Sequence, residues 1–321
     1  MTHPFKKHFE DSFRDFLSVI STDSGEWTVK GFIDLYKNIY TISLDTKVVS
    51  KVIELMIFPK IVEFARDNNY KIVLSEYQNH YPDVTFIDND TGEKIALDIK
   101  STYRINDNKV NGMTLGAFTG YFRNRTSTKN ITFPYDEYAK HYVFGIIYSR
   151  TDMVNAQDVL SDMGFALDTS QRKKLSKYLS NQNKATFEEL TDALRVTDEK
   201  LIAEIGTRLS ECLIDERKIY SLDELQNILS VVRDFEFFLQ EKWRIASDKP
   251  GSGNTKNIGS TKLLSELING TGIFTKYEKG EEIFNDYWRY YLTEDMRAMA
   301  ELDRAPYSNI KEYLRYKGIQ Q

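Results

Sequence analysis

The sequence has only one cysteine, Cys212, among its 321 residues. A single thiol cannot form an internal disulfide, and it cannot supply the paired cysteines of a structural zinc site. The sequence also lacks an uninterrupted run of about 18 apolar residues, so no segment is predicted to span a membrane. The N-terminal segment mixes charged and apolar residues and lacks the apolar core of a signal peptide. From these absences we expect a soluble cytoplasmic protein.

An excess of positive charge is also missing, since the net charge is −5. This balance argues against indiscriminate nucleic-acid binding but leaves room for a local basic groove. Positive charge gathers in residues 101–150, where Arg123, Arg125 and Lys129 lie in the run YFRNRTSTKN. Two interpretations stay open for this run: a solvated face, or a strip that contacts phosphates. The hydrophobic content of 41% is sufficient for a sizeable core.

Hydrophobic periodicity predicts a mixed α/β (α+β) fold. A helix is expected from residue 5, followed by irregular or strand-like structure to residue 40. A second helix is expected over 44–69, with Asp45 or Thr46 as its N-cap and an interruption at Pro59. The C-terminal part is predicted to be largely helical. Alternating or continuous apolar runs predict strands in YKIVLSEY (70–77), DVTFID (83–88), KIALDIKSTY (94–103), HYVFGIIYSR (141–150) and VVRDFEFFLQEKWRIA (231–246).

Residues 153–217 differ from the rest because they are polar, poor in glycine and helical in pattern. Three helices are predicted, over 170–183, 186–196 and 198–214. Thr186 is expected as an N-cap, with Glu189 closing a capping box. The last two helices are similar to a helix-turn-helix, but Asp198 and Glu204 make the second helix a poor partner for phosphates. We therefore favour a structural or protein-contacting insert over a DNA-reading one.

Two aspartates and a lysine form the pattern that could carry chemistry. Asp83 begins one predicted strand, and Asp98 lies near the end of the next, so a hairpin can bring both carboxylates to one end of a sheet. Asp98 and Lys100 are two residues apart and project from the same face of their strand. Two carboxylates can bind Mg²⁺, and a lysine beside them can orient water and offset charge on phosphorus. The alternative is a turn-capping aspartate with a surface ion pair.

Short runs in two parts of the chain resemble Type II restriction endonucleases of the PD-(D/E)xK superfamily. The resemblance covers about residues 41–150 and 218–321, in the same order along the chain. The runs are SLDTKVVSKVIEL, QNHYPDVTF, KIALDIKSTY, TLGAFTGYFRN, TKNITFPYDEY, FFLQEKW, GSGNTKNIGS, GIF and DYWRYY. So many ordered matches are far more specific than the aspartate–lysine pattern alone.

The resemblance implies a homodimeric, Mg²⁺-dependent nuclease that cuts double-stranded DNA at a six-base palindrome. If the family's target GATATC applies, the cut is blunt, with 5′-phosphate and 3′-hydroxyl ends. A DNA methyltransferase for the same site is expected as a genetic partner. The implied fold is a mixed central sheet flanked by helices. Residues 1–152 and 218–321 would form the catalytic and DNA-binding domain, with 1–43 in the dimer contact, and 153–217 would be an insert of unknown role.

Carried over by motif, the resemblance assigns individual residues. Asp83, Asp98 and Lys100 are implied as the catalytic set, and Glu54 as an auxiliary catalytic acid and a third metal ligand beside the two aspartates. Residues implied to contact DNA outside the glycine-rich loop are Thr46, Lys47, Gln78, Asn79, Ser101, Thr102, Thr119 and Lys129. Tyr77, Lys256 and a small insertion at 125–128 depart from the family pattern. His80 is interpreted as a loop residue rather than a general base.

The run PGSGNTKNIGS (250–260) lacks the spacing of a phosphate-binding P-loop. Gly251 and Gly253 allow backbone groups to approach base edges closely, Asn254 can pair with adenine, and the Thr255 methyl can pack on thymine. Together with Ser252, Lys256 and Asn257, these residues are predicted to read the major groove. Two alternatives remain at this point: a non-cleaving DNA-binding regulator, and a structure-specific repair nuclease on the same fold.

Overall fold

The computed structural model describes residues 3–75, 77, 80–180, 186–211, 218–251 and 254–319. Its central sheet consists of β3 (Tyr70–Leu74), β4 (Val84–Asp88), β5 (Lys94–Asn106), β8 (Tyr138–Arg150) and β10 (Val232–Glu241). The strand order is β10-β8-β5-β4-β3, and β5 and β8 are parallel whereas the other neighbours are antiparallel. A short strand, β6 (Lys109–Val110), pairs with the far end of β5. The predicted mixed sheet is thus confirmed.

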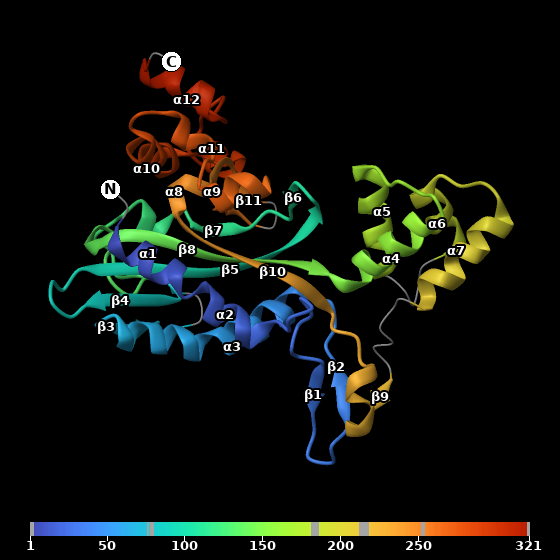
Figure 1. Cartoon of the computed structure of the whole chain (residues 1–321). Coiled ribbons are helices and arrows are strands. Elements are labelled where there is room, and N and C mark those ends of the chain that lie inside the picture. The colour runs from blue at the N-terminus through green and yellow to red at the C-terminus, as the bar shows by residue number, and fades with distance from the viewer. Residues whose placement is uncertain are drawn as a thin grey trace.

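One face of this sheet is covered by α1 (Pro4–Asp11), α2 (Phe13–Ile20) and α3 (Thr46–Asp67), as Figure 1 shows. The predicted first helix is therefore two short helices that meet at Ser12. Their phenylalanines pack against the sheet: the ring centroids of Phe5 and Phe86 are 5.0 Å apart, and those of Phe9 and Phe144 are 5.1 Å apart. This aromatic layer fixes the N-terminal segment beneath the sheet.

The expected interruption at Pro59 is wrong, because α3 continues through it. A proline inside a helix removes one hydrogen bond to the residue four positions earlier. That residue, Leu55, is 62% exposed, so the missing hydrogen bond lies on the solvent side of the helix. The opposite side buries Ile53, Ile57 and Ile61 against the sheet, and this packing holds the helix together. The predicted N-cap is confirmed: the Asp45 side chain accepts from the Lys47 N–H.

The other face carries a small sheet and the C-terminal helices. The sheet has the order β11-β12-β7, and its core neighbours include the fully buried Trp288, Tyr287 and Phe118. The elements are β7 (Thr114–Ala117), α8 (Lys242–Ile245), β11 (Ala246–Gly251), β12 (Asn254–Ser260), α9 (Leu264–Asn269), α10 (Gly280–Tyr290), α11 (Glu294–Met299) and α12 (Ile310–Lys317). This arrangement brings the glycine-rich segment to the same side of the molecule as β7.

A third, three-stranded sheet projects from the main body in Figure 1. It is formed by β1 (Gly31–Ile33), β2 (Ile39–Thr41) and β9 (Ile219–Tyr220). Its apolar side chains are unusually open to solvent: Leu35 and Tyr36, in the turn between the first two strands, are 91% and 82% exposed. Several exposed apolar side chains on one small element are typical of an interaction site.

Residues 153–217, predicted to be an insert, contribute most of a separate helical lobe (Figure 1) with its own apolar core. It contains α4 (Thr151–Asp162), α5 (Thr169–Ser180), α6 (Phe187–Leu194) and α7 (Glu199–Glu211). The three predicted helices are present, and a fourth, α4, precedes them directly after β8. The predicted capping box is confirmed, since the Thr186 hydroxyl accepts from the Glu189 N–H and the Glu189 carboxylate accepts from the Thr186 N–H.

Candidate active site

The β4–β5 hairpin brings the predicted carboxylates together. Val84 pairs with Leu97, so Asp83, just before β4, lies beside Asp98 on β5. The Ile99 N–H donates a hydrogen bond of 2.6 Å to Asp83 Oδ2. Because the alternation along β5 places Asp98 and Lys100 on one face, their side chains meet at this end of the sheet. The predicted juxtaposition of the three residues is present in the structure.

Lys100 bridges the two aspartates. Its Nζ lies 2.8 Å from Asp98 Oδ1 and 3.7 Å from Asp83 Oδ2. Burial alone would lower the pKa of Lys100, but the charges of Asp98 and Asp83 outweigh burial and raise it above the usual range. Lys100 is therefore a protonated ammonium at neutral pH. Such a group can bind and orient water or a phosphate oxygen, but it cannot itself serve as the base.

Asp83 has an altered proton affinity. Burial raises the pKa of its carboxyl group to about 6; the Lys100 charge acts in the opposite direction, and the neighbouring Asp98 charge adds to the rise. A cation bound between the Asp83 and Asp98 carboxylates would offset the cost of burying their charges and would reduce the repulsion between them. The site is therefore electrostatically suited to a bound metal ion.

Asp98 supplies a second indication of a metal site. It is only 5% exposed, and its Oδ2 atom is buried without a hydrogen-bond partner among the described residues. Buried carboxylate oxygens are normally paired, so an open one suits a cation ligand. Within the described ranges, no group of three or more His, Cys, Asp or Glu side chains is placed to hold a metal ion. The two aspartates thus fit a divalent cation that completes its shell with water and substrate oxygens.

These residues line a pocket of about 730 Å³. Three further residues predicted to bind DNA, Thr119, Lys129 and Asn257, line the same pocket, as does His80. The ring centroids of His80 and Tyr77 are 4.7 Å apart. The remaining lining residues are Tyr81, Thr114, Gly116, Ala117, Gly120, Tyr121, Asn124, Ser127 and Asn130. Many of them carry hydroxyl or amide groups, which can contact a phosphate backbone.

Glu54 lies in a neighbouring pocket of about 480 Å³, and its carboxylate pairs with Lys51 at 2.8 Å. The same pocket is lined by Thr46, Lys47, Ser101 and Thr102, all predicted to contact DNA. Two of these hydroxyls are used within the protein: Ser101 shares a 2.6 Å hydrogen bond with Ser50, and Thr102 donates to the Asn111 carbonyl. The structure therefore gathers these residues around the pocket next to Asp83 and Asp98. Glu54 does not form a three-carboxylate cluster with the two aspartates.

Both arginines of the basic run 121–130 form hydrogen bonds within the protein. Arg123 donates to the Tyr291 carbonyl at 2.5 Å, and Arg125 donates to Asn285 at 2.8 Å and to Asp136 at 3.4 Å. These guanidinium groups join the run to the C-terminal helices, and neither arginine lines the pocket of Asp83 and Asp98. The interpretation of the run as a phosphate-contacting strip stays a prediction. Of the three basic residues, Lys129 is the one that lines the catalytic pocket.

The glycine-rich segment lies beside the pocket that contains Asp83, Asp98 and Lys100. Strand β12 pairs with β7 at Asn257 and Ala117, and the Phe118 N–H donates to the Lys256 carbonyl at 3.2 Å. Gly251 ends β11 and pairs with Asn254. Gln78, Asn79, Ser252 and Gly253 lie outside the described residues, as do the side chains of Asn254 and Thr255. Their predicted DNA contacts stay predictions.

Sequence reasoning missed Lys242, Tyr81 and Tyr121. Tyr81 and Tyr121 line the catalytic pocket, and the Lys242 Nζ lies 3.9 Å from the centroid of the Tyr81 ring. Lys242 follows β10 in the run FFLQEKW, which contributed to the family resemblance but assigned no role to the lysine. Only the fold brings it to the hairpin that carries the catalytic aspartates.

A mixed sheet with two aspartates and a lysine at a hairpin end defines the class of protein: a nuclease of the restriction-endonuclease type. The family model "Restriction endonuclease EcoRV" matches residues 23–181 and 201–318. The Type II restriction enzyme EcoRV of Escherichia coli is 31% identical over 301 residues, which span 93% of this chain and 94% of that enzyme. The chain belongs to the EcoRV restriction endonuclease family and is a hydrolase, a Type II site-specific deoxyribonuclease.

The comparisons also extend the predicted resemblance. The family match begins at residue 23 and runs to residue 181, so it includes much of the N-terminal region and the first two helices of the insert, α4 and α5. The gap in the match is confined to residues 182–200.

Within the described residues, every helix is too short or too polar to traverse a lipid bilayer.

Proposed function

We propose that this enzyme cleaves both strands of DNA at a six-base palindrome in a Mg²⁺-dependent reaction. The observation that carries the proposal is the Asp83–Asp98–Lys100 cluster, with its open Asp98 Oδ2, inside a pocket lined by polar residues. Asp83 and Asp98 would hold the metal. When bound there, Mg²⁺ polarises the scissile phosphate and lowers the pKa of its bound water.

Lys100 is the proposed positioning group for the attacking water. Its ammonium donates to Asp98 at 2.8 Å and to the Ile99 carbonyl at 3.2 Å, and its third N–H is proposed to bind a water or a non-bridging phosphate oxygen. Positive charge at this position offsets the negative charge that develops on the phosphate in the transition state. Cleavage of the bond to the 3′ oxygen leaves 5′-phosphate and 3′-hydroxyl ends. Glu54, paired with Lys51 in the adjacent pocket, is proposed as an auxiliary acid.

DNA would lie across both pockets. Thr46, Lys47 and Lys129 are proposed to contact its backbone. Lys129 lines the pocket of Asp83 and Asp98, and Thr46 and Lys47 line the neighbouring pocket. Further backbone or minor-groove contacts are proposed for Gln78, Asn79, Ser101, Thr102 and Thr119. The segment from Gly251 to Asn257 is proposed to enter the major groove, with Asn254 pairing with adenine and Thr255 packing on a thymine methyl.

The proposed target is GATATC, cut bluntly at its centre. The central TA step kinks easily, so bending can add selectivity without direct contact. The run GSGNT is unchanged from the family pattern, which supports an unchanged target. Lys256, in place of the family's threonine, either adds a phosphate contact or alters the preference.

A palindromic target calls for a two-fold symmetric enzyme. We propose a homodimer in which residues 1–43 form part of the contact, supported by the exposed Leu35 and Tyr36 on the projecting sheet. In this proposal residues 1–152 and 218–321 form the catalytic and DNA-binding domain, and 153–217 form the insert. A DNA methyltransferase of the same specificity would protect the host chromosome, and both proteins would act in the cytoplasm.

Plasmid DNA cleavage with and without Mg²⁺ tests the proposal. Discrete fragments from intact duplex, formed only with the metal, are expected. A non-cleaving DNA-binding regulator would give no cuts with any divalent ion, and a repair nuclease would cut at mismatches or junctions instead of at a fixed sequence.

A further inference from the structure

Lys242 is a buried lysine that the proposed reaction does not use. It begins α8, is 1% exposed, and its Nζ has no hydrogen-bond partner among the described residues. An isolated buried ammonium is strongly disfavoured, and it persists only where other groups stabilise the charge. Here one such group is the Tyr81 ring, whose centroid lies 3.9 Å from the Lys242 Nζ.

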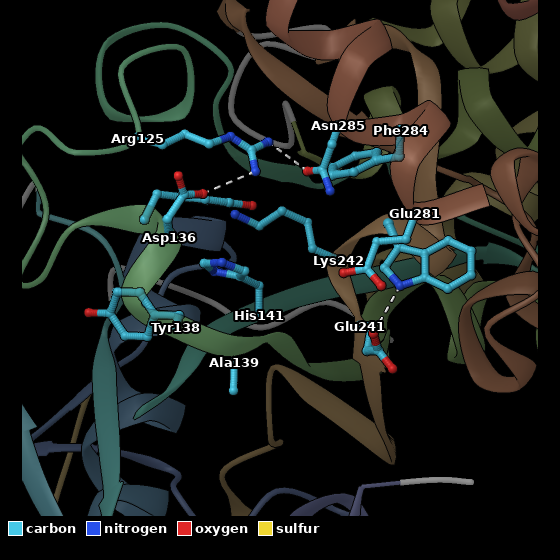
Figure 2. Close-up of a pocket in the computed structure, with 12 residues that line it drawn as sticks. Arg125, Asp136, Tyr138, Ala139, His141, Glu241, Lys242, Glu281, Phe284 and Asn285 are labelled. Atoms are coloured by element: carbon cyan, nitrogen blue, oxygen red, sulfur yellow. Dashed lines mark hydrogen bonds and ion pairs between the residues drawn. The ribbon is translucent and has the colours of Figure 1, made fainter. Parts of the chain in front are cut away.

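The position of Lys242 connects two cavities. On one side is the catalytic pocket, which Tyr81, Gly116 and Tyr121 line. A Cβ atom at Gly116 would lie 3.7 Å from the Lys242 Nζ and 3.2 Å from the Tyr121 hydroxyl, so only a glycine separates the ammonium from that pocket. On the other side is a polar cavity of about 120 Å³ (Figure 2), where the Lys242 side chain reaches between Arg125 and His141. A polar cavity of that size accommodates water, which supplies acceptors to the ammonium.

Lys242 and Asp98 lie around the same pocket, because Asp98 and Tyr81 both line it and the Tyr81 ring contacts the Lys242 Nζ. Burial lowers the pKa of Lys242 to about 7; the negative charge of Asp98 opposes this effect, whereas Lys100 and Arg125 add to it. Asp98 is thus the principal carboxylate that favours the charged amine. Asp98 in turn uses Oδ1 for Lys100 and leaves Oδ2 buried without a partner. The Lys242 Nζ and the Asp98 Oδ2 are both buried, and neither has a hydrogen-bond partner among the described residues.

We propose that Lys242 is a positioning residue of the catalytic centre that acts through Asp98 as a second positive charge behind the metal-binding carboxylates. The inference rests on the proposed function, because it assumes that Asp98 is a metal ligand in phosphodiester hydrolysis. In its protonated form the Lys242 amine opposes the binding of a metal cation but favours the negative charge that develops on the phosphate. It therefore has opposite effects on metal affinity and on turnover.

Lys242→Met tests this role, because methionine keeps most of the apolar stem and removes the charge. Lys140→Met is the matched control: Lys140 is also partly buried, lies on β8, and is paired with Glu241 at 3.0 Å rather than near Asp98. Three quantities are measured in each full-length variant: kcat and KM for plasmid cleavage, the Kd for Mn²⁺ of the DNA-free protein from the electron paramagnetic resonance signal of free Mn²⁺, and Tm.

For Lys242→Met we expect kcat to fall about tenfold or more, with KM for DNA unchanged. The Kd for Mn²⁺ should be unchanged or smaller, and Tm should be unchanged or higher because an unpaired buried charge is removed. For Lys140→Met, kcat and the Kd for Mn²⁺ should both match the wild type. This combination differs from that of a structural residue, whose loss lowers Tm and weakens metal binding together with turnover.

Two results would overturn the inference while leaving the proposed function intact. The first is a Lys242→Met enzyme whose kcat lies within twofold of the wild type. The second is a fall in kcat accompanied by a lower Tm or weaker Mn²⁺ binding, which would make Lys242 a packing residue. Absence of cleavage by the wild-type protein would instead overturn the proposed function itself, and this inference with it.

Discussion

Lys100 lies 2.8 Å from Asp98 and 3.7 Å from Asp83, so one ammonium contacts both carboxylates at the end of the β4–β5 hairpin. The contact neutralises only part of the negative charge, and one oxygen of Asp98 stays open. In the proposed function, this imbalance is what attracts a divalent cation. Substitution of each of the three side chains should therefore have its own measurable effect.

Asp98→Ala should reduce Mg²⁺-dependent cleavage by about 10³-fold or more, a barrier change of about 4 kcal/mol, because the metal loses a buried ligand. DNA binding measured with Ca²⁺, which occupies such sites without supporting the chemistry, should persist. Filter binding and plasmid cleavage measure the two effects on the same preparation. Undiminished cleavage by the variant would refute the assigned role of Asp98.

Lys100→Met should lower kcat by about 10²–10³-fold, the range typical for loss of a charge-stabilising group, with a smaller effect on KM. The methionine leaves Asp98 and Asp83 without their shared counter-charge, so metal binding to the DNA-free protein should become tighter rather than weaker. Single-turnover kinetics and Mn²⁺ titration give the two quantities. Equal losses of metal binding and turnover would argue that Lys100 only holds the hairpin together.

The pKa of Asp83, raised to about 6 by burial, gives a pH prediction with a defined sign. Between about pH 4 and 6 the folded protein binds more protons at this carboxyl than the unfolded chain, so the contribution of Asp83 to stability declines as pH rises through 6. Asp83→Asn removes the charged form and should raise Tm at pH 8 while changing it little at pH 4. Thermal unfolding without metal at both pH values measures the effect; a higher Tm at pH 4 alone would contradict it.

The ionisation of Asp83 should also shape activity. Because only the carboxylate form binds a cation well, cleavage at limiting Mg²⁺ should increase as pH rises through about 6, and a high Mg²⁺ concentration should shift this limb to lower pH. Rates across a pH series at two metal concentrations measure the shift. A limb that does not move with Mg²⁺ would assign the titration to another group.

The exposed turn of the projecting sheet predicts a dimer contact. Leu35→Asp should convert the proposed homodimer to monomer and reduce double-strand cleavage, because a charge is placed at a residue that is 91% exposed in the single chain. Analytical ultracentrifugation measures the oligomeric state. Leu55→Asp is a control at another exposed leucine, on α3, and should leave the dimer unchanged; a monomeric wild type would remove the basis for this prediction.

Asn254 is predicted to contribute to base recognition. Asn254→Ala should lower cleavage at the preferred site by about 10- to 100-fold relative to sites that differ by one base pair, since a bidentate contact is worth about 1–3 kcal/mol. Lys249→Ala is the control: the Lys249 side chain donates to the Ser308 carbonyl at 2.8 Å, and its removal should leave the ratio unchanged. Competition cleavage of paired oligonucleotides measures the ratio directly.

The part of the site that is local in sequence could be predicted. Asp83, Asp98 and Lys100 lie on one hairpin, where strand alternation and a short turn determine which side chains meet. The N-cap Asp45 and the capping box at Thr186 are likewise short-range features. Each depends on backbone geometry within a few residues, and each was recognisable from residue type and spacing.

The features that were not predicted depend on long-range packing. The helix runs through Pro59 because its apolar side packs on the sheet, which no local propensity reveals. Arg123 and Arg125 are bound by residues of the C-terminal helices, more than a hundred positions away. Lys242 approaches Tyr81 and Gly116, both of which lie more than a hundred positions earlier in the sequence. The spacing of residues in the sequence does not predict such long-range contacts.

The central claim is that the Asp83–Asp98–Lys100 cluster hydrolyses DNA at one palindromic sequence with Mg²⁺. Digestion of a plasmid or phage DNA of known sequence, followed by sequencing of the fragment ends and testing of the end groups, examines it most directly. We predict blunt ends at the centre of GATATC, with 5′-phosphate and 3′-hydroxyl groups, formed only with the metal. Random ends, or cuts that do not need a divalent ion, would contradict the account.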